Sequence, residues 1–131
     1  MALLQFLLPS GGDRYEDGMR IRRRVLGSSH VDRASASPAS SDFQDLITRY
    51  AWGSIWTRPG LDIRTRRLLV LAMTAALGRW EEFRLHVRTG LPRELEWCDL
   101  EEVLLEAAVY AGVPVANTGL RHAAAERDAE L

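Results

Sequence analysis

Two side chains that can exchange protons stand four residues apart in this chain, Glu82 and His86. On an α-helix, residues at this spacing share one face, so the carboxylate and the imidazole can influence each other's ionisation. A neighbouring carboxylate favours the imidazolium form of histidine, which donates a proton near neutral pH. The spacing therefore predicts a general acid, although a carboxylate and an imidazole at this spacing also form ordinary surface contacts.

Arginines gather in the segment 48–67, which reads TRYAWGSIWTRPGLDIRTRR. Arg58 lies beside a Pro-Gly turn, and Arg66 and Arg67 belong to the helical pattern that follows. A guanidinium group can meet a carboxylate with two parallel hydrogen bonds, so these three arginines are candidates for binding an anionic substrate. Each of them can equally be a solvated or ion-paired surface residue, and the sequence leaves that alternative open.

Aromatic rings are interleaved with these arginines, because Tyr50, Trp52 and Trp56 fall at helical spacing. Large rigid rings can wall a pocket and exclude water, and Trp56 and Tyr50 are the two candidates for that role. Aromatic residues at helical spacing also build helix cores, which is an open alternative for all three rings.

The composition limits the classes of chemistry and of partner. All 17 basic side chains among the 131 residues are arginine, so a lysine Schiff base or lysine general base is excluded. The formal net charge of −1 provides no overall attraction to nucleic acid or to an acidic membrane, which leaves small molecules and proteins as partners. Cys98 is the only cysteine, so there is no internal disulfide or CxxC pair, and we expect a cytoplasmic protein. The scattered histidines lack metal-ligand spacing, so we expect no bound metal.

Helical periodicity runs through most of the chain, and no strand pattern of period two occurs. The pattern predicts an all-α fold with about six helices, at 15–26, 41–56, 62–78, 80–89, 99–112 and from 114 into a charged tail where the last helix fades at 123–131. Asp62 and Asp99 are expected to cap the third and the fifth of these helices. The Ser-, Ala- and Pro-rich segment 28–41 is expected to be a loop, and residues 1–14 an N-terminal arm or linker before one helical domain at 15–131.

The string RYAWGSIWTRPGLDIRTRR at 49–67 resembles the 4-carboxymuconolactone decarboxylase family, whose members share an RYAWG-x-IW-x-RPGLD-x-RTR pattern. The resemblance continues through AALGR at 75–79, LHVR at 85–88 and YAGVP at 110–114, and it covers nearly everything from Tyr15 to Asn117. It implies the alkylhydroperoxidase-D-like helical fold and a homo-oligomer, either a hexamer or a trimer.

The resemblance also implies a reaction, the decarboxylation of 4-carboxymuconolactone to 4-oxoadipate enol-lactone in the protocatechuate branch of the β-ketoadipate pathway. The electron pair left behind by carbon dioxide can flow through the ring double bond into the lactone carbonyl, so no cofactor is implied. The resemblance makes His86 the proton donor and Glu82 the residue that orients it. Arg58, Arg66 or Arg67 would then bind a substrate carboxylate or the oxyanion.

Three alternatives differ from this interpretation in their chemistry. Glu82 stands where redox-active members of the wider fold carry a reactive cysteine, which argues against a thiol-dependent peroxidase. The segment ELEWC at 94–98 departs from the family pattern, which allows a related decarboxylase or lactone-processing enzyme of a secondary-metabolite pathway. Crowded arginines and small alanines would also suit a non-catalytic helical oligomer that binds a ligand.

Overall fold

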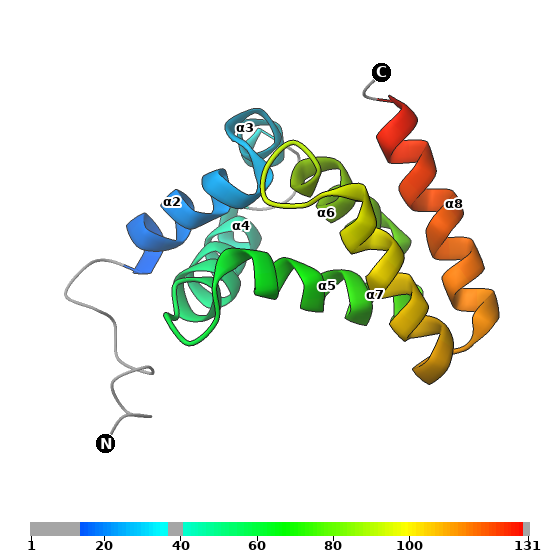
Figure 1. Ribbon diagram of the computed structural model, residues 1–131. Coiled ribbons are helices and arrows are strands. Elements are labelled where there is room, and N and C mark those ends of the chain that lie inside the picture. Colours follow the sequence, from blue (N-terminus) through cyan, green and yellow to red (C-terminus); the bar gives the residue numbers. More distant parts are fainter. Residues whose placement is uncertain (1–13, 37–40, 130–131) are drawn as a thin grey trace. The chain divides into compact units, whose positions relative to one another are not determined.

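The computed structural model describes residues 14–36 and 41–129, and every regular element within these ranges is a helix (Figure 1). For the described residues, the prediction of an all-α fold is therefore confirmed. The chain divides into two compact units, one ending at Leu61 and one beginning at Asp62. Nearly all of the predicted arm at 1–14 lies outside the described residues.

The two units differ in their helices. The first contains α2 (Arg14–Leu26), α3 (Ser28–Ser35), α4 (Ser41–Ile47) and the π-helix η1 (Thr48–Trp56). The second contains α5 (Ile63–Leu77), α6 (Trp80–Gly90), α7 (Trp97–Tyr110) and α8 (Val113–Ala129). Because η1 follows α4 without a break, the two together match the helix predicted at 41–56.

In the first unit, α2 and η1 approach each other so closely that two glycines are needed. A Cβ atom on Gly18 would lie 2.3 Å from the carbonyl oxygen of Thr48. A Cβ atom on Gly53 would lie 2.4 Å from the carbonyl oxygen of Arg14. Any other residue at either position would force the two backbones apart, so the glycines set the distance between these helices.

The prediction of a loop at 28–41 is wrong for its first part, which forms α3, while residues 37–40 lie outside the described part of the chain. Val31 is fully buried, and Arg23 of α2 forms an ion pair with Asp32 at 2.9 Å. A short isolated helix is marginal in water, so these tertiary contacts, which no local pattern reveals, account for α3.

The second unit packs four helices around an apolar core, with α5 and α8 each in contact with both α6 and α7. The core side chains come from all four helices and from the turn before α7: Leu71, Ala75, Phe83, Val87, Leu95, Leu100, Leu104, Ala116 and Ala123. Each large apolar side chain buried in this way stabilises the fold by roughly 1.5–3 kcal/mol. This core fixes α5 and α6 against each other, and these are the helices that carry the candidate active site.

The helix ends of the second unit follow from local chemistry. Asp62 caps α5 as predicted, since its carboxylate accepts a hydrogen bond of 2.8 Å from the backbone N–H of Thr65. That hydrogen bond also holds the pKa of Asp62 below its usual value. α5 ends at Gly78, where φ is 69°, a conformation that favours glycine.

The start of α7 and the end of α8 differ from the prediction for reasons that the capping and the packing show. α7 begins earlier than expected, because Glu96 is its N-cap and Asp99 lies three residues inside, where the two side chains complete a capping box. α8 continues to Ala129 instead of fading at 123–131. Ala123 and Glu126 are buried, so the end of α8 is held by packing that its polar sequence does not indicate.

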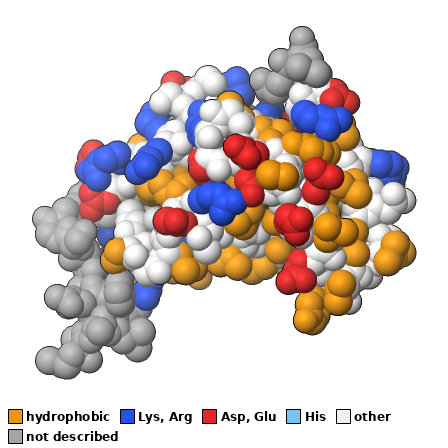
Figure 2. All heavy atoms as spheres, viewed as in Figure 1, with side chains coloured by type: hydrophobic (Ala, Val, Ile, Leu, Met, Phe, Trp, Pro, Cys, Tyr) orange, Lys and Arg blue, Asp and Glu red, His pale blue; other side chains and the backbone are white. Residues whose placement is uncertain are grey.

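Several large apolar side chains stay on the surface of α7 and at the start of α8. Hydrophobic atoms gather at that end of the two helices, at the lower right of Figure 2. The exposed fractions are 63% for Leu105, 73% for Val109, 84% for Tyr110 and 69% for Val113. Among the described helices, none has both the length and the apolar content that crossing a membrane would need.

Candidate active site

A buried cation and a buried imidazole meet between α5 and α6. Arg67 of α5 is 0% exposed, and His86 of α6 is 3% exposed. Nη1 of Arg67 lies 3.3 Å from Nδ1 of His86 and 3.5 Å from the carbonyl oxygen of the same residue. Few polar groups are so deeply buried in this unit, and a buried charge is costly unless it is well paired.

Arg67 has further partners that satisfy its guanidinium group. Its Nη1 donates to the hydroxyl of Thr89 at 2.7 Å, and its Nε donates to Glu94. The hydroxyl of Thr89 in turn donates to the carbonyl oxygen of Leu85 at 2.8 Å. Burial lowers the pKa of Arg67, and the hydrogen bond to Glu94 opposes that shift. The guanidinium group is nevertheless cationic at any physiological pH.

The other side of the imidazole faces a carboxylate. Nε2 of His86 lies 3.9 Å from Oε2 of Glu82, one helical turn earlier on α6. The side chain of Glu82 is 62% exposed, so this carboxylate is accessible to water. His86 therefore lies between a fixed, buried cation at one nitrogen and an accessible carboxylate at the other.

The sequence predicted Glu82 and His86 on one face of a helix, and the structure places them there. Arg67 differs from the prediction of a substrate-binding arginine, because its side chain is inaccessible and held by protein groups. Arg66, the next residue on α5, is half-buried and is a better candidate for meeting a substrate.

The other three candidate residues belong to the first unit. Trp56 stacks on the buried Trp52 with ring centroids 4.9 Å apart, so this ring is tied to the core of its unit. Tyr50 is 68% exposed on η1. Arg58 is half-buried and follows η1, and its backbone N–H donates to the carbonyl oxygen of Ile55 at 3.1 Å. π-Helical turns occur often at functional sites, so the residues in and after η1 remain candidates for binding a substrate.

Thr89, Glu94 and Gly90 also belong to the surroundings of Arg67, and none of them was predicted; a Cβ atom on Gly90 would lie 3.1 Å from Nε of Arg67. Thr89 lies three residues after His86, so helical spacing could have placed it near that side chain. Glu94 offered no such signal, since it comes from the turn after α6 and meets Arg67 across 27 residues of sequence. Its segment is the one that departs from the family pattern.

Cys98 is exposed, and its surroundings disfavour the thiolate form. Desolvation, followed by the nearby carboxylates of Asp99 and Glu96, raises the pKa of Cys98 above its usual value. A raised pKa leaves less thiolate, which is the nucleophilic form. The structure therefore gives no support to thiol-dependent peroxidase chemistry at this residue.

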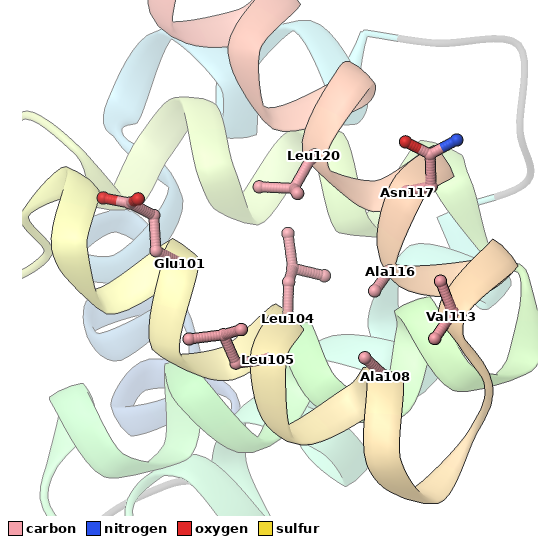
Figure 3. A pocket seen from close by; sticks show the side chains of 8 residues that line it. All are labelled: Glu101, Leu104, Leu105, Ala108, Val113, Ala116, Asn117 and Leu120. Carbon is pink, nitrogen blue, oxygen red and sulfur yellow. The ribbon is translucent and has the colours of Figure 1, made fainter.

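A groove of about 330 Å³ runs along the surface between α7 and α8 (Figure 3). Its lining is mainly aliphatic, with one carboxylate and one amide: Glu101, Leu104, Leu105, Ala108, Val113, Ala116, Asn117 and Leu120. It contains no arginine to meet an anion and no histidine. The groove is therefore a poor candidate for binding a dicarboxylate.

Comparisons with known proteins show which family and which relatives this chain resembles. The model of the carboxymuconolactone decarboxylase family matches residues 41–125. The chain is 40% identical over 112 residues to 4-carboxymuconolactone decarboxylase of Acinetobacter baylyi, which covers 84% of each chain. It is 48% identical over 42 residues to the protein of the same name from Pseudomonas putida, covering 30% of this chain and 88% of the relative.

A third relative has a different named substrate. The chain is 39% identical over 102 residues to nitrosuccinic acid decarboxylase of Metarhizium robertsii, which covers 76% of this chain and 71% of the relative. All three of these relatives are decarboxylases, and the family model spans both the segment of the arginines and the helix of Glu82 and His86. The chain belongs to the carboxymuconolactone decarboxylase family.

Proposed function

We propose that this protein catalyses the cofactor-independent decarboxylation of 4-carboxymuconolactone to 4-oxoadipate enol-lactone, as a step of the protocatechuate branch of the β-ketoadipate pathway. The observation that carries the proposal is the buried imidazole of His86, which lies between the guanidinium group of Arg67 and the accessible carboxylate of Glu82. Such a group can stabilise one developing negative charge and help to place one proton, which is all that this reaction asks of a protein.

The bonds of the reaction explain that requirement. The carbon–carbon bond to the departing carboxylate breaks, and carbon dioxide leaves without its electron pair. That pair moves through the ring double bond and forms a dienolate with negative charge on the lactone carbonyl oxygen. One proton then adds to the carbon next to that carbonyl. Donors aimed at the growing oxyanion lower the barrier to the first step, and a positioned acid completes the second.

The substrate carries carboxylates, and we assign their binding to arginine. Arg66 is half-buried beside Arg67 on α5, and Arg58 is half-buried after η1. A substitution of either arginine by alanine is expected to raise KM and leave kcat nearly unchanged, because binding is equal in ground and transition states. Trp56 and Tyr50 are proposed to exclude water from the substrate.

Nitrosuccinic acid is the substrate of a second candidate function, which the 39% identity to the Metarhizium robertsii relative favours. Nitrosuccinic acid has two carboxylates and a nitro group that can take up an electron pair when carbon dioxide leaves. Decarboxylation of either substrate would need the same groups from the protein, namely arginines that bind the carboxylates and a hydrogen-bond donor that stabilises the developing charge.

We also propose that the protein works in the cytoplasm as a homo-oligomer, a trimer or a hexamer. The apolar side chains exposed on α7 and α8 support the oligomer, since surfaces of this kind usually mark interaction sites. The single cysteine supports a reducing compartment.

The function is tested by giving purified protein each substrate in turn. 4-Carboxymuconolactone is generated in situ, its loss is followed by ultraviolet absorbance, and carbon dioxide release is measured in the same reaction. Turnover of the lactone well above that of nitrosuccinic acid supports the proposal. The reverse preference would assign the second function, and no turnover of either by folded protein would contradict both.

A further inference from the structure

We infer that Arg67 is a positioning residue, which holds His86 as the neutral imidazole with its proton on Nε2. The catalytic consequence rests on the proposed function, whereas the tautomer itself can be observed without any substrate.

The tautomer follows from the donors of arginine. A guanidinium group has five N–H donors and no acceptor. Because Nη1 of Arg67 lies 3.3 Å from Nδ1 of His86, that ring nitrogen must accept the hydrogen bond and carries no proton. A neutral imidazole then has its proton on Nε2. Protonating Nδ1 would point an N–H at a cation, which loses the hydrogen bond and brings two positive charges together.

Further hydrogen bonds hold the guanidinium group of Arg67 in its position beside His86. Its Nε donates to Glu94 and its Nη1 to Thr89 at 2.7 Å. The hydroxyl of Thr89 uses its only proton on the carbonyl oxygen of Leu85, so toward Arg67 it can act only as an acceptor. Every one of these contacts has a fixed direction of donation, from the arginine outward.

Gly90 gives space to the stem of Arg67. A Cβ atom at this position would lie 3.1 Å from both Cδ and Nε of Arg67, and 2.6 Å from Cδ1 of Leu95. The last residue of α6 therefore lacks a side chain where the arginine passes. The absence of a side chain at Gly90 leaves room for the buried Arg67. The contact between Arg67 and His86 is part of the packing of α5 against α6.

Charged groups reach this place from α5, from α6 and from the turn after α6: Arg67, Glu82, Arg93 and Glu94. On the side of α8, Glu126 accepts hydrogen bonds from Arg84 and Arg88. Arg93 donates to the carbonyl oxygen of Thr89 at 2.8 Å, and its charge lies near Arg67. The cation at Nδ1 is thus buried and fixed, while the carboxylate at Nε2 is exposed to solvent.

This arrangement gives the two residues other roles than the resemblance implied, in which His86 was the proton donor and Glu82 oriented it. The neutral Nε2–H of His86 donates a hydrogen bond to the forming oxyanion and keeps its proton, since losing it would leave an imidazolate. Glu82, which is 62% exposed, takes up a proton from water, transfers it to the carbon next to the lactone carbonyl and returns to the carboxylate.

The test uses nitrogen NMR of the ¹⁵N-labelled, full-length protein, with the signals of His86 assigned by their loss in His86→Gln. We expect a single neutral tautomer, protonated on Nε2, through the range near pH 6.5 in which an ordinary histidine titrates. In Arg67→Met, His86 is expected to become charged on acidification and to lose its single tautomer. Arg64→Met is the matched control, since Arg64 lies on the same helix and pairs with Asp99 on α7.

Kinetics separate positioning from a merely structural role. In Arg67→Met, His86 is no longer held as the Nε2–H donor to the oxyanion. The value of kcat is therefore expected to fall by about 10²-fold, as for loss of one oxyanion donor, with KM little changed. Its pH profile should also gain an ionisation that the wild type lacks. If Arg67→Met does not fold, Thr89→Val removes an acceptor of Arg67 and should give the same spectral change in weaker form.

Two results would overturn the inference. One is a wild-type His86 that is doubly protonated, or protonated on Nδ1, at neutral pH. The other is an Arg67→Met protein with the spectrum and pH profile of the wild type. A wild-type protein that shows the Nε2–H tautomer but does not decarboxylate the lactone would refute the proposed function and leave the role of Arg67 intact.

Discussion

At the scale of single residues, removal of the carboxyl group of Glu82 should affect the chemical step and leave substrate binding nearly unchanged. Glu82→Gln keeps the size of the side chain and removes its acid, so kcat is expected to fall by about 10²- to 10⁴-fold while KM changes little. Steady-state kinetics on the lactone measure this effect. Glu81→Gln is the matched control, because Glu81 is an exposed neighbour in the same helical turn. Equal rates for the two variants would remove Glu82 from the mechanism.

Residue spacing predicted only part of this site. The interval of four between Glu82 and His86 places them together on any helix, so the pair could be found from sequence. The partners of Arg67 could not, because Glu94 and Thr89 meet it across 27 and 22 residues of sequence. From the sequence alone, an arginine that binds a substrate cannot be distinguished from one that orients a histidine. The groups that surround the arginine in the fold make the difference.

At the scale of helices, the crossing of α2 and η1 depends on a missing side chain. Gly18→Ala would place a Cβ atom 2.3 Å from the carbonyl oxygen of Thr48. Overpacking of this kind typically costs about 1–3 kcal/mol in the free energy of unfolding, which urea denaturation would measure. Gly60→Ala is the control, since a Cβ atom there meets nothing within 4 Å. A Gly18→Ala protein as stable as this control would contradict the close crossing.

α8 carries a histidine, His122, that is expected to make the stability of the protein depend on pH. His122 of α8 stacks on Trp80 of α6 at 4.9 Å, and burial, followed by Arg84 and Arg121, lowers the pKa of His122. A lowered pKa means that the unfolded chain binds the proton more readily. The folded protein is therefore expected to lose stability as pH falls below the ordinary value of about 6.5.

His122→Phe keeps the stacked ring and removes the titrating group. Its free energy of unfolding should change less between pH 7 and pH 5 than that of the wild type, measured by denaturation at each pH. An unchanged pH dependence would show that His122 has the same proton affinity in the folded and unfolded chains.

Helices with a clear apolar stripe and a local cap were predictable, and those held by tertiary contacts were not. Asp62 and Gly78 mark both ends of α5 in the sequence, and the structure confirms them. α3 escaped prediction because one buried valine and one ion pair hold it. The start of α7 was placed late because Glu96 caps it, and glutamate is a less common N-cap than the aspartate chosen.

At the scale of the whole molecule, the exposed apolar side chains of α7 should lie between copies of the chain. Val109→Glu and Leu105→Glu are expected to give a smaller species by light scattering after size-exclusion chromatography, since a buried charge is costly. Glu102→Gln on the same helix is the control and should keep the wild-type size. A wild-type protein that is monomeric, or charged variants of unchanged size, would contradict this interface.

The class of fold and the family were predictable because they depend on patterns spread over most of the chain, namely helical periodicity and a long matching string at 49–67. What the site does depends on a few contacts that the string does not reveal. The relatives illustrate the difference, since proteins about equally similar to this chain carry the names of two substrates.

His86 and Glu82 are proposed to serve the decarboxylation of a lactone. The most direct measurement is carbon dioxide release from 4-carboxymuconolactone by excess enzyme in a single turnover, comparing wild type, His86→Gln and Arg64→Met. We expect rapid release by wild type and Arg64→Met, and release slower by about 10²- to 10³-fold in folded His86→Gln. Release at the wild-type rate by His86→Gln would exclude His86 from the reaction.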